Sequence, residues 1–306
     1  MLRQVLLGAS RSDLVRRSVT SAPITRGVVR RFVAGETLDD AVAAVRTLTG
    51  DGLRVSLDRL GEDVFDAEHA HATADAYVTL LGRLGDEGLA DRAEVSLKLS
   101  AVGQALDPSM AVDNARRVCE AAAAVGTTVT CDMEDHSTTD LTLDAVRDLR
   151  QDFPWVGAVL QAYLRRTEAD CLDLATPGSR IRLCKGAYKE PATVAWQDTH
   201  DVDRSYVRCL KVLMAGEGYP MVASHDPRLI EIAEALATRW RRSPDSFEYQ
   251  MLYGIRPDEQ RRLAAGGASV RVYLPYGSDW YAYFMRRLAE RPANLTFFLR
   301  SVVTTS

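Results

Sequence analysis

The chain has 306 residues, 46% of them hydrophobic, and a formal net charge of −4, so it is long enough for one large domain or two small ones. The acidic balance argues against a nucleic-acid-binding protein. The 5 cysteines are widely spaced and include no Cys-x-x-Cys pair, which argues against a disulfide framework or a structural zinc site and favours a reducing cytosol. The longest uncharged stretch, 153–164, is too short to span a bilayer.

The first 35 residues contain 7 arginines and one acidic residue, Asp13. Arg-rich, acid-poor segments occur in organelle transit peptides and in helices that lie on a membrane surface. The alternative is a solvated helix packed outside the main domain. We expect residues 1–50 to form a helical segment packed on the main domain, which spans residues 51–306.

Short strand-like runs recur along the rest of the chain, separated by segments with helical spacing of apolar residues, such as 114–124 and 230–240. Alternating strands and helices imply parallel pairing with crossover helices. Eight such units favour a (β/α)₈ barrel, or TIM barrel, over a doubly wound sheet, because no Gly-x-Gly-x-x-Gly turn is found. The predicted strands are 54–58, 95–99, 128–132, 157–161, 181–185, 221–225, 247–251 and 270–274.

Every predicted strand ends beside a polar or ionisable side chain. The carboxyl ends of the strands carry the active site in barrels of this kind. Lysine is rare here, with 4 lysines against 34 arginines, yet Lys98 and Lys185 both stand at strand ends. One polar strand end is ordinary on a protein surface, but eight in succession indicate a site. These residues are Asp58, Lys98, Asp132, Gln161, Lys185, His225, Gln250 and Tyr273.

The segment 182–188 reads as a strand that ends abruptly in Lys185-Gly186. An ammonium group beside a glycine could hold flavin or phosphate oxygens, since glycine permits close approach of the backbone. Arg182 points to the opposite face of an extended strand from Lys185. A buried arginine needs a partner, and the alternative to a ligand is an internal ion pair with a carboxylate such as Asp132.

After the last predicted strand, residues 281–290 read as a helix. Tyr283 shares a helix face with Arg286 and Arg287, which follow three and four residues later. An aromatic ring beside two guanidinium groups suits a small organic acid, because the arginines grip its carboxylate and the ring covers its apolar part. The alternative is a solvated arginine pair on an ordinary helix.

Two histidine motifs raise the question of a metal. His69 and His71 fall within a helical pattern over 67–81, where residues two apart face different directions. His225-Asp226 stands at the sixth strand end, but no other histidine has a matching spacing. We therefore expect no metal site.

With these residues in view, the chain resembles the proline dehydrogenase family, and it is most similar to the monofunctional bacterial members. The resemblance covers most of the barrel. Its most specific parts are 247–254, 273–294 and the Lys-Gly-Ala-Tyr sequence within 182–188. The other matching stretches are 31–36, 96–100 and 159–163.

The resemblance implies a distorted (β/α)₈ barrel that binds FAD at its mouth. It also implies oxidation of L-proline to 1-pyrroline-5-carboxylate, the first step of proline catabolism to glutamate. In this family pattern Lys98, Arg286 and Arg287 bind the carboxylate of proline, and Tyr273, Tyr283 and Leu252 enclose its ring. Asp132 orients the cations, and Glu62 pairs with the first arginine to close the site. The flavin contacts implied in the same way are Gln161, Arg182, Lys185, Gly186, Ala187, Tyr188, His225 and Glu290.

Two positions bear on how this chain compares with the rest of the family. Lys189 stands where bifunctional members carry a tryptophan against the flavin, which implies a more open site. Related hydroxyproline-oxidising enzymes carry serine at the position of Tyr273. A bulky tyrosine there leaves little room for a ring hydroxyl and favours proline.

The resemblance also implies that a membrane quinone accepts the electrons and that a pyrroline-5-carboxylate dehydrogenase uses the product. We expect a cytoplasmic protein, and the basic N-terminus suggests the hypothesis of peripheral attachment to anionic lipid at the inner face of the membrane.

Three other functions remain open from the residues alone. A Schiff-base aldolase could use Lys98 or Lys185, since barrel lysines at strand ends suit imine chemistry. A proline-sensing module would bind proline without turnover, although a scaffold has no need of so many ionisable groups facing inward. A metal-dependent hydrolase would require stoichiometric metal.

Overall fold

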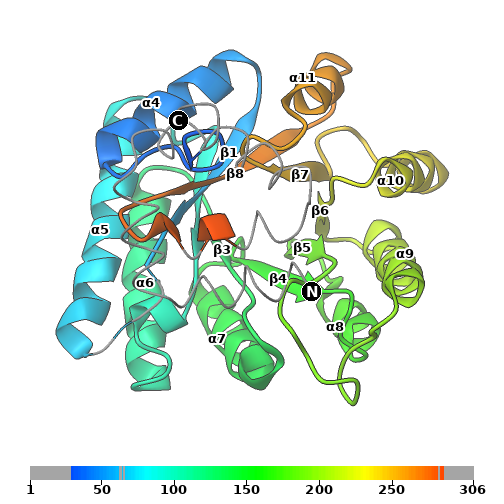
Figure 1. Cartoon of the computed structure of the whole chain (residues 1–306), viewed down its shortest axis with the longest axis horizontal. Helices are drawn as coiled ribbons and strands as arrows, with labels where there is room; N and C mark the ends of the chain where they lie inside the picture. The colour runs from blue at the N-terminus through cyan, green and yellow to red at the C-terminus, as the bar shows by residue number, and fades with distance from the viewer. Residues whose placement is uncertain (1–28, 62–63, 65, 282, 286–306) are drawn as a thin grey trace, which may run out of the picture.

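Eight parallel strands close into a barrel in chain order, with β1 paired to both β2 and β8 (Figure 1). The computed structural model describes residues 29–61, 64, 66–281 and 283–285. The predicted (β/α)₈ fold is confirmed, and each predicted strand lies within two residues of its expected bounds. The strands are β1 (Arg54–Arg59), β2 (Ala93–Leu97), β3 (Val129–Cys131), β4 (Gly157–Gln161), β5 (Arg180–Cys184), β6 (Tyr219–Ala223), β7 (Glu248–Leu252) and β8 (Val270–Tyr276).

Helices follow the strands and cover the outside of the barrel (Figure 1). Asp66, Asp107, Asp198 and Asp226 each stand before a helix and accept a backbone N–H bond from its first turn, which fixes where that helix begins. The helices are α4 (Leu38–Gly50), α5 (Ala67–Asp86), α6 (Pro108–Ala124), α7 (Thr139–Asp152), α8 (Thr167–Leu174), α9 (Thr199–Ala215), α10 (Pro227–Arg239) and α11 (Pro257–Ala265), with short 3₁₀ turns η1 (Ser100–Val102) and η2 (His136–Thr138).

The main apolar core lies between the strands and the helices. Leu57 of β1 and Leu97 of β2 are fully buried with Leu80 and Leu81 of α5. Because side chains alternate along a strand, the neighbours of these leucines, such as Ser56, point into the barrel instead.

A second apolar cluster joins the start of the described chain to its end. Phe284 is fully buried, and its ring centroid lies 6.3 Å from that of Phe32 and 6.0 Å from that of Trp280. The members of this cluster are Val29, Phe32, Val33, Leu60, Ile255, Trp280, Tyr281, Tyr283, Phe284 and Met285, with Leu252 packed against it.

Inside the barrel, an ion-pair layer made of Glu94, Arg180, Glu248 and Arg271 replaces the branched apolar side chains usual in such barrels. Glu94 lies 2.8 Å from Arg180 and 3.7 Å from Arg271, and Glu248 accepts bonds of 2.7 and 3.0 Å from Arg271. Burial opposes ionisation of Glu94, but the nearby arginines outweigh it and lower the pKa of this carboxyl. The layer lies toward the amino ends of the strands.

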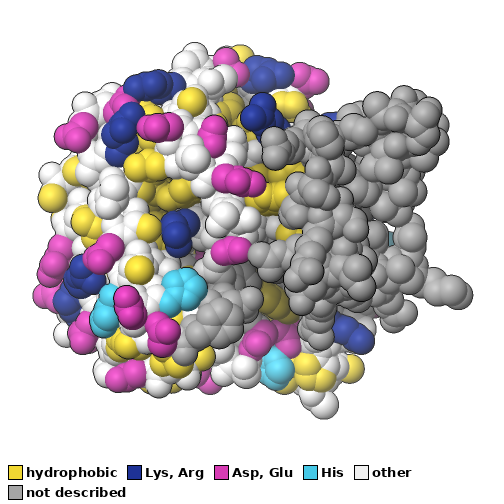
Figure 2. Space-filling view, turned by 60° about the vertical axis from the view of Figure 1, so that its left-hand side comes forward, with side chains coloured by type: hydrophobic (Ala, Val, Ile, Leu, Met, Phe, Trp, Pro, Cys, Tyr) yellow, Lys and Arg dark blue, Asp and Glu magenta, His cyan; other side chains and the backbone are white. Residues whose placement is uncertain are grey.

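The described part of the outer surface mixes charges of both signs. Lys and Arg side chains lie among Asp and Glu side chains on the face seen in Figure 2. Within the described residues, no helix combines the length and the apolar character needed to cross a bilayer.

Candidate active site

Three strands bring Asp132, Arg182 and Tyr273 together inside the mouth of the barrel. Asp132 directly follows β3, and its backbone N–H donates to the carbonyl of Leu97 at 2.8 Å, which fixes its position. One carboxylate oxygen accepts from Arg182 Nη1 at 2.6 Å, and the other accepts from the hydroxyl of Tyr273 at 2.7 Å. The ion pair between Arg182 and Asp132, which the sequence offered as the alternative to a ligand contact, is therefore present.

Arg182 is held in place by neutral groups as well. Its Nε donates to Gln250 Oε1 at 2.5 Å, and its two Nη atoms donate to Ser96 Oγ at 2.8 Å and Ser56 Oγ at 3.2 Å. The guanidinium carbon lies 5.3 Å from the ring centroid of Tyr273, within range of a cation–π contact. A guanidinium so fully bonded is a rigid, buried positive charge.

Tyr273 remains protonated in this setting. Burial is the main cause that raises its pKa well above 10, and the nearby carboxylates of Asp132 and Asp58 raise it further. The phenol therefore acts as a hydrogen-bond donor at any physiological pH.

Lys98 lies one residue beyond β2, where the sequence placed it within the strand. Its ammonium group donates to Asp58 Oδ1 at 2.8 Å, and both side chains are almost entirely buried. Asp58 lies on β1, so this ion pair joins two neighbouring strand ends at the same mouth as Asp132 and Tyr273.

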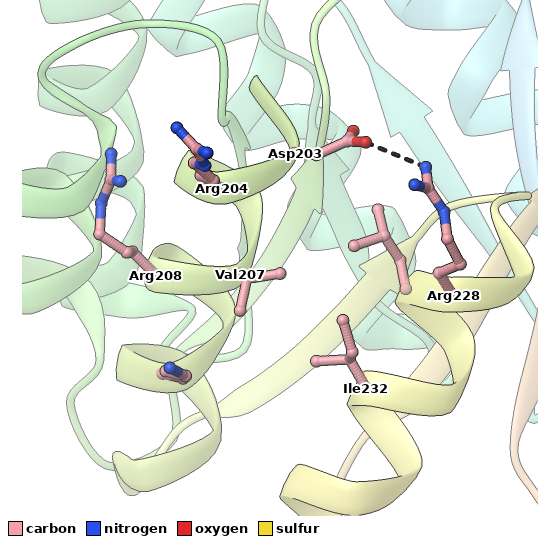
Figure 3. Close-up of a pocket in the computed structure, with 8 residues that line it drawn as sticks. Asp203, Arg204, Val207, Arg208, Arg228 and Ile232 are labelled. Atoms are coloured by element: carbon pink, nitrogen blue, oxygen red, sulfur yellow. Dashed lines mark hydrogen bonds and ion pairs between the residues drawn. The ribbon is translucent and has the colours of Figure 1, made fainter. Parts of the chain in front are cut away.

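Lys185 points away from this centre, as expected from its spacing to Arg182. Its ammonium group donates to Asp203 of α9 at 2.6 Å and to Asp226, the residue before α10, at 3.2 Å. Arg228 bonds the same two carboxylates. Figure 3 shows its bond to Asp203. The hydrogen bonds from Arg228 are the main cause that lowers the pKa of Asp226; burial opposes them and Lys185 reinforces them.

The groove between α9 and α10 in Figure 3 begins at these ion pairs. It encloses about 420 Å³ and has an apolar floor that includes Val207 and Ile232. Arg208 on its wall is paired with Glu168 at 2.9 Å. The charges of the groove are largely balanced by neighbouring carboxylates. The groove lies on the outer side of the barrel.

Gly186 packs directly against an aromatic ring. It has a φ of +108°, and a Cβ at this position would lie 2.3 Å from the ring of Tyr163, so only glycine fits. The backbone N–H of Tyr163 donates to the carbonyl of Lys185 at 2.9 Å. Ala187 is exposed, whereas Tyr188 packs partly buried against the group that contains Tyr163.

Gln161 and His225, two predicted flavin contacts, are each held by a hydrogen bond to a backbone group. Gln161 at the end of β4 donates from Nε2 to the carbonyl of Glu134 at 2.7 Å. His225, two residues beyond β6, accepts at Nε2 from the backbone N–H of Leu252 at 2.9 Å, which assigns the proton of its neutral ring to Nδ1. The bond links a predicted flavin contact to a predicted substrate contact.

Tyr283 and Leu252 are both predicted to enclose the proline ring. Tyr283 belongs to the second apolar cluster, and Leu252 packs against that cluster. Tyr283 is 6% exposed. Four predicted site residues lie outside the described residues, and these are Glu62, Arg286, Arg287 and Glu290.

The sequence reading overlooked Ser56 and Ser96, which bond Arg182. The sequence carries a signal for them, because Glu94, Ser96 and Lys98 alternate with apolar residues along β2 and the residue after it. Such alternation in a strand covered by helices indicates a polar interior. No group of three or more potential metal-ligating side chains is found among the described residues.

Comparison with known proteins assigns a family to this geometry. A family model described as proline dehydrogenase matches residues 41–300. Proline dehydrogenase 1 of Bacillus subtilis (strain 168) is 38% identical over 303 residues, 99% of either chain. The proline dehydrogenase of Deinococcus radiodurans is 42% identical over 281 residues, 90% of either chain.

Larger proteins contain a similar unit. The bifunctional protein PutA of Escherichia coli (strain K12) is 29% identical over 348 residues, which cover 98% of this chain and 26% of PutA. The crystal structure of proline utilization A from Bdellovibrio bacteriovorus, inactivated by N-propargylglycine, has a TM-score of 0.80 at 24% identity. That match covers 86% of this chain and 32% of the other. The solved structure supports the barrel fold.

Proposed function

This chain belongs to the proline dehydrogenase family, and we propose that it oxidises L-proline to 1-pyrroline-5-carboxylate with FAD and passes the electrons to a membrane quinone. The observation that carries the proposal is the convergence of Asp132, Arg182 and Tyr273 at the mouth of the barrel. Family membership accounts for proline oxidation, and this cluster supports a site for it.

The donors at the ends of β4, β5 and β6 fit a flavin. The amide of Gln161 and the imidazole N–H of His225 suit the acceptor atoms of a flavin ring. The ammonium of Lys185 uses two of its three donors on Asp203 and Asp226, and the third suits a phosphate oxygen. Arg182, in the middle of β5, is bonded to Asp132, Gln250 and two serines and would act on the ring through its charge. The glycine at position 186 is explained by its packing against Tyr163, and this packing fixes the backbone next to these donors. The chemistry that bound FAD would supply is acceptance of a hydride from the carbon next to the proline nitrogen.

The protein's own residues would bind and orient the substrate. Lys98 is proposed to bind the carboxylate together with Arg286 and Arg287; an ammonium has three donors and can keep its bond to Asp58 while it binds a carboxylate. Tyr273, Tyr283 and Leu252 are proposed to enclose the ring. In the balanced reaction one C–H hydride and one N–H proton leave proline, a C=N bond forms, and the proton goes to solvent.

The arrangement of the lysines disfavours a Schiff-base aldolase. Imine formation needs a neutral, accessible amine. Lys98 is ion-paired with one buried carboxylate and Lys185 with two carboxylates, and an ion-paired lysine is a poor nucleophile. Trapping with borohydride and a carbonyl substrate should leave the protein unmodified.

The test is the visible absorbance spectrum of the purified protein before and after anaerobic addition of L-proline, with D-proline as the matched control. A flavin band that bleaches with L-proline alone supports cofactor, substrate and direction of electron flow together. A flavin band that stays oxidised contradicts the substrate. A protein without flavin, even after supplementation with FAD, contradicts the cofactor.

The quinone and membrane parts of the proposal have their own test. Reduction of a water-soluble quinone by the proline-reduced enzyme should be faster than reduction of oxygen. If the basic N-terminus attaches the protein to anionic lipid, deletion of residues 1–28 should weaken binding to phosphatidylserine vesicles. Unchanged vesicle binding contradicts the attachment.

A further inference from the structure

We propose that Glu36 and Trp280 form a positioning latch, which holds the chain that contains Tyr283 over the mouth of the barrel and so sets the affinity for proline. This inference rests on the proposed function, because Tyr283 is the proposed cover of the proline ring. The latch residues themselves touch no proposed substrate atom, so they act through the segment that they hold.

The latch is a single directed bond between two distant parts of the sequence. Trp280 Nε1 donates to Glu36 Oε1 at 2.9 Å. Trp280 is 6% exposed, whereas Glu36 is exposed. An indole N–H can only donate, so the Glu36 carboxylate satisfies the one polar group of this ring and orients it.

The segment that carries Glu36 is fastened to the barrel just before the latch. The backbone N–H of Ala34 donates to the carbonyl of Pro275, and the N–H of Gly277 donates to the carbonyl of Gly35, both at 2.9 Å. Pro275 belongs to β8, the strand that carries Tyr273. The backbone next to Glu36 is therefore held at a fixed position relative to the site.

The same segment crosses the loop after β7 at close range. Gly254 has a φ of +73°, and a Cβ placed there would lie 1.7 Å from the carbonyl oxygen of Arg31. Leu252, two residues earlier, packs against the cluster that also contains Phe32 and Tyr283. The segment 31–36 thus braces both proposed walls of the ring pocket.

The position of Trp280 is transmitted to Tyr283 by packing. The ring centroid of Trp280 lies 6.0 Å from that of Phe284, at an interplanar angle of 80°. Phe284 is fully buried and adjacent to Tyr283. A displaced Trp280 ring would therefore move the backbone that carries Tyr283.

The experiment compares Trp280→Phe, which removes the N–H donor but keeps a ring, with Glu36→Ala and Glu36→Gln. Glu36→Gln keeps an acceptor oxygen and should restore the bond. The matched control is Trp240→Phe, since Trp240 is an exposed tryptophan on the far end of α10. The readouts are KM and kcat for L-proline, and the Kd of cyclopentanecarboxylate, which has the ring and carboxylate but no oxidisable amine.

We expect Trp280→Phe and Glu36→Ala to raise KM and Kd about fivefold to tenfold, because losing the bond lowers by that factor the fraction of molecules that hold Tyr283 in place. We expect kcat, flavin content and Tm to stay near wild type, and Glu36→Gln and Trp240→Phe to behave like wild type. Because Glu36 is exposed, its variants test the latch even if Trp280→Phe fails to fold.

An unchanged Kd in Glu36→Ala overturns the latch. The latch is also overturned if kcat and Tm fall together with the affinity, because that result indicates a merely structural role for the bond. Failure of the proposed function looks different. In that case the wild-type protein itself binds no cyclopentanecarboxylate and is not reduced by L-proline.

Discussion

Tyr273 and Asp132, 141 positions apart in sequence, are joined by a hydrogen bond of 2.7 Å across the mouth of the barrel. The second oxygen of the same carboxylate is taken by Arg182. The carboxylate of Asp132 is therefore held by both Tyr273 and Arg182. A change to either donor alters the strength of the bond to the other.

Tyr273→Phe removes the phenol and leaves one oxygen of Asp132 without that donor. We expect kcat/KM for L-proline to fall about tenfold, the cost of one hydrogen bond to a charged group. The control is Tyr249→Phe on β7, because the buried Tyr249 hydroxyl has no hydrogen-bond partner among the described residues. Equal losses in the two variants would contradict a specific role for the Tyr273–Asp132 bond.

The same phenol gives a prediction at alkaline pH. Burial, aided by Asp132, raises the pKa of Tyr273 well above its unfolded value of 10.0. The protonated form is favoured in the folded state, so the stabilisation is complete below pH 10 and is lost as the pH rises above it. In urea titrations, the wild-type free energy of unfolding should fall relative to that of Tyr273→Phe above about pH 10. A difference that stays constant to pH 11 would argue against the raised pKa.

Glu94→Gln should break the ion-pair layer inside the barrel. Arg180, Arg271 and Arg182, which lies 3.6 Å from Glu94, then face a neutral amide. We expect a loss of about 3–5 kcal/mol in the free energy of unfolding at pH 7. The matched control is Glu120→Gln, an exposed glutamate on α6, which should change stability by less than about 0.5 kcal/mol.

The effect of Glu94→Gln should depend on pH. The folded pKa of Glu94 lies below its unfolded value of 4.5, so its stabilisation is present above pH 4.5 and is lost as the pH falls toward the folded pKa. The stability gap between wild type and variant should narrow below about pH 4.5. A gap that widens on acidification would mean that Glu94 is not ionised in the folded protein.

Gly186→Ala tests the backbone next to the proposed flavin site. The new methyl group would collide with Tyr163, and the backbone would keep a φ that alanine disfavours. We expect a loss of about 2–4 kcal/mol in stability and weaker retention of FAD on dilution. Gly178→Ala is the control for backbone strain alone, because Gly178 has a φ of +76° and open space around its Cβ position. Its loss should be about 1 kcal/mol with FAD retention unchanged.

Arg286→Ala and Arg287→Ala test the proposed carboxylate clamp. Loss of a charge-assisted bond, worth about 1.5–3 kcal/mol, should raise KM for L-proline about 10- to 100-fold. Arg204→Ala on the outer surface of α9 is the control and should leave KM unchanged. A wild-type KM in both clamp variants would show that the carboxylate binds elsewhere.

The sequence predicted the barrel because each strand and each helix has its own local pattern. It also predicted that Lys98, Asp132 and Tyr273 lie at one mouth, since parallel strands present their carboxyl ends together. The pair of Arg182 with Asp132 was one alternative offered by the sequence. The other partners inside the barrel could not be predicted, because the choice of Asp58 for Lys98 or Gln250 for Arg182 depends on how far the strands are staggered. Lys185 illustrates the limit, since its two carboxylates come from α9 and from the residue before α10, which no spacing rule connects to it.

The ion-pair layer also constrains how this barrel can evolve. Removing one member of a buried ion-pair group is costly, whereas replacing the whole group by apolar residues can be neutral. A substitution at position 94, 180, 248 or 271 is therefore disfavoured until its partners change as well. Across natural variants we expect these four positions to change together. An ancestor with apolar residues at these positions would be separated from this chain by unstable intermediates.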